Sequence, residues 1–167
     1  MLNSSLLSYT DSDLRVPQRK KRVELFHFVD RGSVYDAPID VLWEFITKDR
    51  EFHPKAHQDS LRKMKWKDLN EITGEGSCEV VRGGRWAKMR FRITTIPPLV
   101  RIIEEFGGRY DGQKMVFLYT PKGKRTVVDV FVQTRKEVAE ETRRVLAQAF
   151  EEDVPALRDF TRSRKAA

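Results

Sequence analysis

The chain of 167 residues contains a single cysteine, Cys78, and lacks any apolar run long enough to span a bilayer. A lone thiol excludes an internal disulfide and a thiolate metal cluster, and it favours a reducing, intracellular setting. The first residues have no basic start followed by a sustained apolar stretch, so they do not predict a secretion signal. These absences lead us to expect a cytoplasmic protein with no membrane span.

Sequence motifs of the common catalytic classes are also missing. No serine lies in a nucleophile-elbow sequence, and no glycine-rich phosphate loop joins a strand to a helix. The glycines of GEG (74–76) and RGG (82–84) instead predict hairpin turns. Cys78 has no basic neighbours to lower the pKa of its thiol, so we do not expect a cysteine nucleophile. We assign no catalytic residue and no cofactor.

The net charge of +7 is concentrated at the two ends of the chain. Residues 1–22 carry five Lys/Arg against two Asp, and residues 158–167 carry four against one. The middle, residues 23–157, has 23 basic and 22 acidic residues and is nearly neutral. We interpret the densest run, PQRKKR (17–22), as a solvated arm, with nucleic acid as the less favoured explanation.

Hydrophobic patterning predicts the order of the secondary-structure elements. Residues 23–35 predict a strand broken near Gly32, and residues 36–46 predict a helix that starts at Asp36 with Pro38 in its first turn. Beyond them, apolar and polar residues alternate as in strands that face water on one side. Six strands are predicted, over residues 61–69, 77–84, 85–96, 99–108, 113–120 and 125–134. Their short links favour an antiparallel meander.

Residues 136–165 return to helical periodicity, with one apolar stripe. Pro155 lies inside this pattern, and because proline has no amide hydrogen we expect a kink or a break near Asp153. A seven-stranded antiparallel sheet has one wide apolar face, and this helix is the element able to cover it. The sequence therefore predicts an α+β fold in which a curved seven-stranded antiparallel sheet wraps around a long C-terminal helix.

Three stretches connect the chain to a known family: DAPIDVLWEFITKDREFHPKAH after the first strand, GKRTVVDVFV in the last hairpin and AFEEDVPALRDF in the final helix. In this order they resemble the helix-grip (SRPBCC) superfamily, which includes START domains, Bet v 1-like proteins and polyketide cyclase-like proteins. The resemblance implies one or two short helices between the first two strands. We divide the chain into a flexible basic leader (1–22), a single helix-grip domain (23–162) and a basic C-terminal tail (163–167).

The resemblance also implies a function. Members of this superfamily mostly bind hydrophobic or amphipathic small molecules in a cavity between sheet and helix, although fold alone does not choose among activities. We predict a binding or carrier protein for a lipid- or polyketide-like molecule. Two alternatives stay open: a cyclase- or hydrolase-type enzyme that uses acids in the pocket, and an RNA-, ribosome- or protein-interaction module that acts through the basic termini. The oligomeric state is not predicted.

Strand alternation assigns particular side chains to the cavity. Arg82 and Glu104 share the parity of apolar neighbours, so we expect them to pair or to orient the polar head of a ligand, although a slip of one residue would turn either to solvent. The facing of Asp129 stays open, and so does a filled core. Including these two charged residues, the predicted ligand-binding residues are Met64, Trp66, Val80, Arg82, Met89, Phe91, Ile102, Glu104, Phe106, Met115, Phe117, Leu146, Phe150 and Leu157.

Two of the three histidines, His53 and His57, lie four positions apart in EFHPKAHQDS (51–60). That spacing can place two metal ligands on one helix face. However, Pro54 favours a helix that begins after His53, so the two rings need not share a face. No nearby acid has a spacing that recommends it as a third ligand. We predict no metal site, and the resemblance places both histidines at the rim of the cavity.

Overall fold

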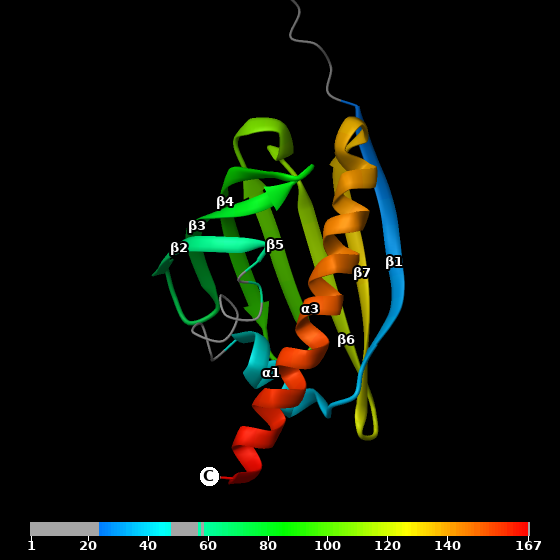
Figure 1. Cartoon of the computed structure of the whole chain (residues 1–167). Helices are drawn as coiled ribbons and strands as arrows, with labels where there is room; N and C mark the ends of the chain where they lie inside the picture. The colour runs from blue at the N-terminus through cyan, green and yellow to red at the C-terminus, as the bar shows by residue number, and fades with distance from the viewer. Residues whose placement is uncertain (1–23, 48–56, 58, 167) are drawn as a thin grey trace, which may run out of the picture.

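The computed structural model describes residues 24–47, 57 and 59–166, and it consists of one sheet with a long helix along its inner face (Figure 1). All neighbouring strands are antiparallel, in the order β1-β7-β6-β5-β4-β3-β2. The elements are β1 (Leu25–Tyr35), α1 (Ile39–Thr47), β2 (Leu61–Asp68), β3 (Thr73–Arg82), β4 (Arg85–Ile96), β5 (Val100–Phe106), η1 (Gly108–Tyr110), β6 (Lys114–Lys122), β7 (Arg125–Arg135), η2 (Lys136–Val138) and α3 (Ala139–Ala166). The predicted α+β fold is confirmed.

Two sequence predictions fall on residues that the structure does not describe. These are the basic leader (1–22) and the second short helix expected from Pro54. Within the described residues, α1 is the helix that lies between β1 and β2.

The helix α3 spans 28 residues and passes through Pro155 without a break. The proline ring removes one backbone hydrogen bond, to the carbonyl of Glu151. Leu157 and Phe160, in the following turns, are buried at 4% and 6% exposure, and this burial holds the rest of the helix against the core. Of the kink or break expected near Asp153, the break is therefore absent. The helix also includes residues 163–166, so these do not form a separate tail.

The break expected near Gly32 is a bulge within β1. The pairing of β1 with β7 shifts register between Asp30 and Ser33, and Gly32 has a φ of 79°, a conformation that glycine adopts at little cost. The Gly32 amide donates to Oδ1 of Asp129 at 3.0 Å. Because Val128 and Val130 face the core, Asp129 faces outward and holds the bulge.

The glycines of GEG lie within β3 and not in a turn, which corrects the sequence prediction. A Cβ on Gly74 would lie 2.1 Å from Cζ2 of Trp66, and one on Gly76 would lie 2.7 Å from Cζ of Phe91. These two aromatic rings therefore lie directly on the strand, in space that only glycine leaves free. The prediction for RGG is confirmed, because Gly83 and Gly84 form the turn between β3 and β4 with positive φ.

The main core lies where α1 and the second half of α3 meet β6 and β7. Leu42 and Phe45 of α1 are fully buried, and the Phe45 ring lies 5.7 Å from that of Phe160. The Thr126 hydroxyl donates to the carbonyl of Ala37, which fastens the start of α1 to β7. This core fixes one half of α3 on the sheet.

Truncation of Phe45 tests this anchoring role. We expect Phe45→Ala to lower the free energy of unfolding by about 3 to 5 kcal/mol, because it removes a fully buried ring and leaves a void. Urea denaturation followed by circular dichroism measures the change. Leu25→Ala, at a side chain 49% exposed, is the control and should change stability by less than about 0.5 kcal/mol. A similar loss in the two variants would contradict the assigned core.

Candidate functional site: a cavity between the sheet and the C-terminal helix

A cavity of about 230 Å³ lies between α3 and the inner face of the sheet. The helix packs mainly against β1, β7 and α1, which leaves the inner face of the middle strands partly uncovered. Most of the wall is apolar. Nine of the fourteen predicted ligand-binding residues line the cavity, together with His57: Met64, Val80, Arg82, Met89, Phe91, Met115, Phe117, Leu146 and Phe150. The other predicted rim residue, His53, lies outside the described residues.

Two further predicted residues lie elsewhere on the inner side. Trp66 contacts Phe91, with ring centroids 5.8 Å apart, and lines a neighbouring hollow of about 270 Å³ near α1. Leu157 is buried in the main core between α3 and α1 and does not line the cavity. Both belong to the apolar interior but to different parts of it.

The inward assignment of Ile102, Glu104 and Phe106 in β5 is wrong. In the ladder between β4 and β5, Phe91 pairs with Glu105 and Arg92 pairs with Glu104. Paired residues share a face of the sheet, and Phe91 lines the cavity, so Glu105 faces inward and Glu104 outward. Outside, Glu104 forms an ion pair with Lys114, and the Arg92 guanidinium covers the Phe106 ring.

The reason for this error is that β5 has apolar side chains on both parities. The even-numbered positions include Ile102 and Phe106, whereas Ile103 is the apolar residue at the odd-numbered ones. Alternation alone therefore assigns the even-numbered residues to the cavity, although they face outward. The β4–β5 turn contains three residues, 97–99, and pairs Ile96 with Val100. A turn of odd length pairs residues of equal parity, so the inward Phe91 of β4 is the signal that could have identified Glu105.

Glu105 and Arg82 form a buried ion pair at one end of the cavity. Nη2 of Arg82 donates to Oε1 of Glu105 at 2.8 Å, and the two side chains are 6% and 2% exposed. Nε2 of Gln113 donates to the same carboxylate oxygen at 2.8 Å. The amide oxygen of Gln113 in turn accepts from the hydroxyls of Thr134 and Thr142, which sets the orientation of its amide group. The partner of Arg82 is thus Glu105, and not Glu104 as the sequence predicted.

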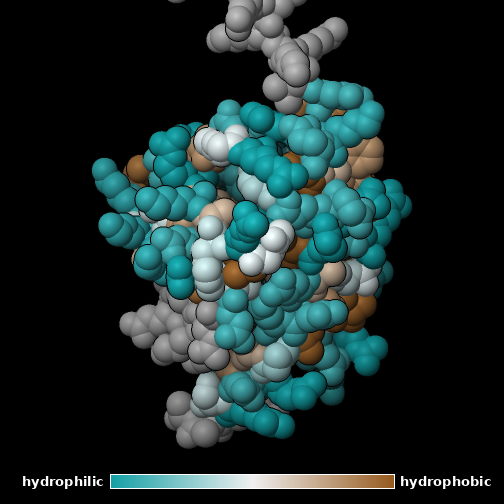
Figure 2. All heavy atoms as spheres, turned by 45° about the horizontal axis from the view of Figure 1, so that its top comes forward, coloured by the Kyte–Doolittle hydropathy of each residue, from teal (hydrophilic) through white to brown (hydrophobic). Residues whose placement is uncertain are grey.

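Tyr110 of η1 covers Arg82 at this end of the cavity, which we call the closed end because its polar lining residues are buried. Its ring lies against the Arg82 guanidinium, 4.1 Å from ring centroid to Cζ. Burial, followed by a hydrogen bond with Glu141, raises the pKa of Tyr110 to about 12. Arg109 forms an ion pair with Glu141 and donates to the carbonyl of Glu137, which ties η1 to the region where α3 begins. The outer surface at this end is mostly hydrophilic, with scattered hydrophobic residues (Figure 2).

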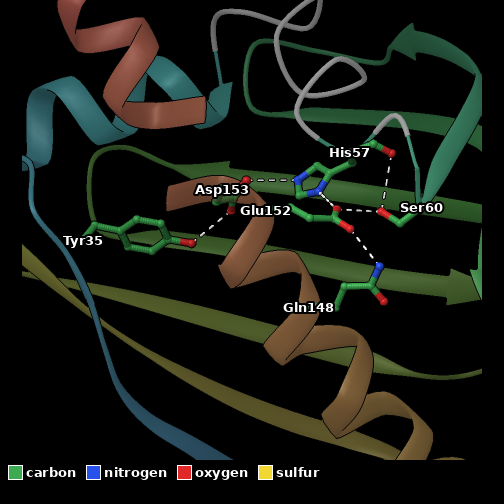
Figure 3. Close-up of polar contacts among 6 residues, drawn as sticks. All are labelled: Tyr35, His57, Ser60, Gln148, Glu152 and Asp153. Carbon is green, nitrogen blue, oxygen red and sulfur yellow. Dashed lines mark hydrogen bonds and ion pairs between the residues drawn. The ribbon is translucent and has the colours of Figure 1, made fainter. Parts of the chain in front are cut away.

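A second polar cluster joins the segment before β2 to α3 (Figure 3). The two ring nitrogens of His57 contact different carboxylates: Nδ1 contacts Glu152, and Nε2 lies 3.0 Å from Oδ1 of Asp153. Ser60 donates to Oε2 of Glu152, and Tyr35 of β1 donates to Oδ2 of Asp153 at 3.0 Å. The cluster therefore connects three separate elements beside the cavity.

The surroundings of this cluster favour a charged imidazolium. Burial alone lowers the pKa of His57, but its contacts with Asp153 and Glu152 outweigh that effect and raise it. Burial alone raises the pKa of Glu152, and hydrogen bonds from Ser60, His57 and Gln148 lower it overall. For Tyr35, burial and the negative charge of Asp153 raise the pKa of the phenol far above its usual value. The contacts of His57 with Glu152 and Asp153 thus stabilise the charged form of its ring relative to the neutral form.

Cys78 lies buried on β3 close to the first cluster. Burial, and then the negative charge of Glu105, raises the pKa of its thiol to about 12, so the thiolate needed for nucleophilic attack is scarce at neutral pH. Among the described residues, no group of three or more His, Cys, Asp or Glu side chains is arranged to hold a metal ion.

Sequence reasoning missed the residues that lie far from their partners along the chain. His57 meets Glu152 across 95 positions, and Arg82 meets Glu105 across 23. In the helical pattern of residues 136–165, Glu152 lies outside the apolar stripe, and nothing there indicates a partner on another element. Nothing in the sequence singles out Tyr35 from the other tyrosines.

Comparison with known proteins identifies the fold. No protein-family model matches the sequence, and no curated protein matches it. Among solved structures, Ara h 8.0201 is 13% identical with a TM-score of 0.64, over 83% of this chain and 99% of that one. The Zhui aromatase/cyclase from Streptomyces sp. R1128 is 14% identical with a TM-score of 0.65, over 83% and 95%. Norcoclaurine synthase from Thalictrum flavum, in complex with dopamine and hydroxybenzaldehyde, is 12% identical with a TM-score of 0.61, over 96% and 98%.

The chain thus has the helix-grip fold, which it shares with the Bet v 1-like proteins and the polyketide aromatase/cyclases. At these identities the likeness concerns the fold and not the activity. No helix among the described residues is long and apolar enough to cross a membrane.

The pH dependence of stability tests the His57 cluster. The pKa of His57 is raised in the folded state, so its stabilising contribution is complete below its unfolded pKa of about 6.5 and is lost as pH rises through the folded value. The pKa of Glu152 is lowered in the folded state. Its contribution is also stabilising, but it has the opposite pH dependence and is lost on acidification. We expect His57→Gln to lower the free energy of unfolding by about 2 kcal/mol near pH 6 and by clearly less at about pH 9.

Urea denaturation at a series of pH values measures this difference. His27→Gln is the matched control, because His27 is exposed on β1 and lies outside the cluster. It should leave the pH dependence of stability unchanged. A loss in His57→Gln that is constant from pH 6 to pH 9 would contradict the charged state assigned to the cluster.

Proposed function

We propose that this protein binds or carries a hydrophobic or amphipathic small molecule in the cavity between the sheet and α3. The observation that carries the proposal is the cavity itself, which has a mostly apolar wall and includes residues of the two polar clusters. A concave, mainly apolar site with a few placed polar groups is the usual form of a small-molecule site. The two polar clusters lie beside an apolar middle, an arrangement that suits an amphipathic ligand.

The volume of the cavity limits the size of the ligand. A dry apolar cavity of about 150 Å³ holds one benzene ring. The present cavity, at about 230 Å³, is roughly half as large again. It suits a ligand of about two fused rings, or a short branched chain, better than a long acyl chain. Met64, Met89 and Met115 in its wall can adjust their shape to such a ligand.

The alternative of a cyclase- or hydrolase-type enzyme rests on acids in the pocket. Glu104, the acid expected for that role, faces away from the cavity. The His57 cluster does border the cavity, but both of its ring nitrogens are engaged with carboxylates and the Tyr35 hydroxyl donates to Asp153. A proton held in this way is not directed at a ligand, so the cluster favours a structural role and supports binding over catalysis.

Two other parts of the sequence prediction stay predictions. An interaction with RNA, a ribosome or a protein through the basic termini depends on residues 1–22, which lie outside the described residues. The cytoplasmic location expected from the single cysteine depends on composition alone.

Filling the cavity tests the proposed function. The wild-type protein should bind the neutral two-ring dye 1-naphthylamine, with a shift of the dye fluorescence to shorter wavelength as the ring system enters an apolar site. Ala149→Trp should abolish this binding, because Ala149 lines the cavity from α3 and an indole would occupy the ligand volume. Ala147→Trp places the same ring on the exposed side of the same helix and should leave dye binding within about twofold of wild type.

Circular dichroism of both tryptophan variants checks that the fold is retained. Solvent extraction of the purified wild-type protein, followed by mass spectrometry, should also yield a bound apolar compound. Equal dye binding by wild type and a folded Ala149→Trp variant would show that the dye does not enter this cavity and would contradict the proposal.

A further inference from the structure

The buried ion pair at the closed end of the cavity has more hydrogen-bonding groups than the described residues satisfy. Nε and Nη1 of Arg82 and Oε2 of Glu105 are buried and have no hydrogen-bond partner among those residues. In contrast, Nη2 of Arg82 donates a hydrogen bond to Oε1 of Glu105, and it also lies 3.6 Å from the sulfur of Met89. Unpaired buried groups of this kind are rare and costly, so each one calls for an explanation.

Both side chains line the cavity, so a ligand is in a position to supply the missing partners. The unpaired atoms themselves have almost no exposed surface, and the Arg82 side chain has to turn toward the cavity to reach a ligand oxygen. Glu105 is held more firmly, because Gln113 donates to its Oε1 atom and the amide group of Gln113 is itself fixed by two threonine hydroxyls. The site thus offers donors on Arg82 and one acceptor on Glu105.

The charge of the pair restricts the ligand further. The charges of Arg82 and Glu105 already balance each other at 2.8 Å. An ionised carboxylate or amine on the ligand would add a net charge beside a pair that is already neutral, and burying an uncompensated charge is strongly unfavourable. An uncharged oxygen group adds none and can both accept and donate.

We propose that Arg82 and Glu105 select a ligand whose buried end carries an uncharged hydroxyl, such as a phenol, which accepts a hydrogen bond from Arg82 and donates one to Oε2 of Glu105. The inference rests on the proposed function and adds the chemical class and the orientation of the ligand. The hydroxyl end lies at the closed end, near Tyr110, and the apolar body of the ligand lies along Phe91, Met115 and Phe117.

Three ligands of nearly equal size test the proposal: 2-naphthol, 2-methylnaphthalene and 2-naphthoate. Displacement of 1-naphthylamine from the wild-type protein at pH 7 gives their relative affinities. We expect 2-naphthol to bind about tenfold more tightly than 2-methylnaphthalene, which corresponds to one net hydrogen bond to a charged group. We expect 2-naphthoate to bind at least about tenfold more weakly than 2-naphthol.

A double variant assigns the preference to the ion pair. Arg82→Met with Glu105→Gln removes both charges but keeps an acceptor for Gln113, and it should reduce the preference for 2-naphthol over 2-methylnaphthalene to about one. The matched control is Arg92→Met with Glu75→Gln, which removes an ion pair of 2.6 Å from the outer face of the same sheet. This control should keep the tenfold preference.

The outcomes separate the inference from the proposed function. Equal binding of 2-naphthol and 2-methylnaphthalene by the wild type, or tighter binding of 2-naphthoate, would overturn the hydroxyl assignment and leave the apolar cavity site in place. A wild-type protein that binds neither the dye nor any of the three ligands would overturn the proposed function itself. The wild-type comparison needs no variant, so the inference stays testable even if the double variant does not fold.

Discussion

The structure depends on one geometric constraint: a single helix covers only part of the width of a seven-stranded sheet. Six strand spacings of about 4.8 Å give a sheet roughly 29 Å wide, whereas a helix with its side chains is about 10 Å across. The helix α3 therefore lies toward β1 and β7, and the inner face of the middle strands is left to curve around a cavity (Figure 1). Leu157 and Phe160 anchor one part of the helix in the main core, and Val138 and Thr142 are buried near its start. The stretch between these anchors forms a wall of the cavity.

The polar groups of the interior follow from the same constraint. Side chains that face a cavity lack the dense packing of a core, and charged ones among them are stable only when paired. Arg82 and Glu105 balance each other at the closed end, and His57 lies between Glu152 and Asp153 where the segment before β2 meets α3. Each cluster ties together elements that the sheet alone would leave apart. Together they border an interior that is apolar in the middle and hydrogen-bonding in two places, which is the basis for proposing an amphipathic ligand.

The sequence was most informative where one parity or one face carried all the apolar residues. In residues 85–96 the apolar side chains share one parity, and both the bounds of β4 and the inward facing of Met89 and Phe91 were predicted correctly. In β5 both parities are apolar, so the facing depends on the length of a turn, and Glu104 was chosen in place of Glu105. The partners of His57 could not be predicted, because they lie on a helix 95 positions away and the contact exists only once the helix lies against the sheet. Gly74 shows the same limit, because the space that its missing side chain leaves is filled by the ring of Trp66 from the neighbouring strand.

The most direct test of a ligand in this cavity uses the methionines. The chain has four, of which Met64, Met89 and Met115 line the cavity and Met1 lies outside the described residues. In a protein labelled with carbon-13 at the methionine methyl groups, addition of 1-naphthylamine should shift the signals of these three residues. Saturating dye that leaves the three cavity signals unshifted would contradict the account.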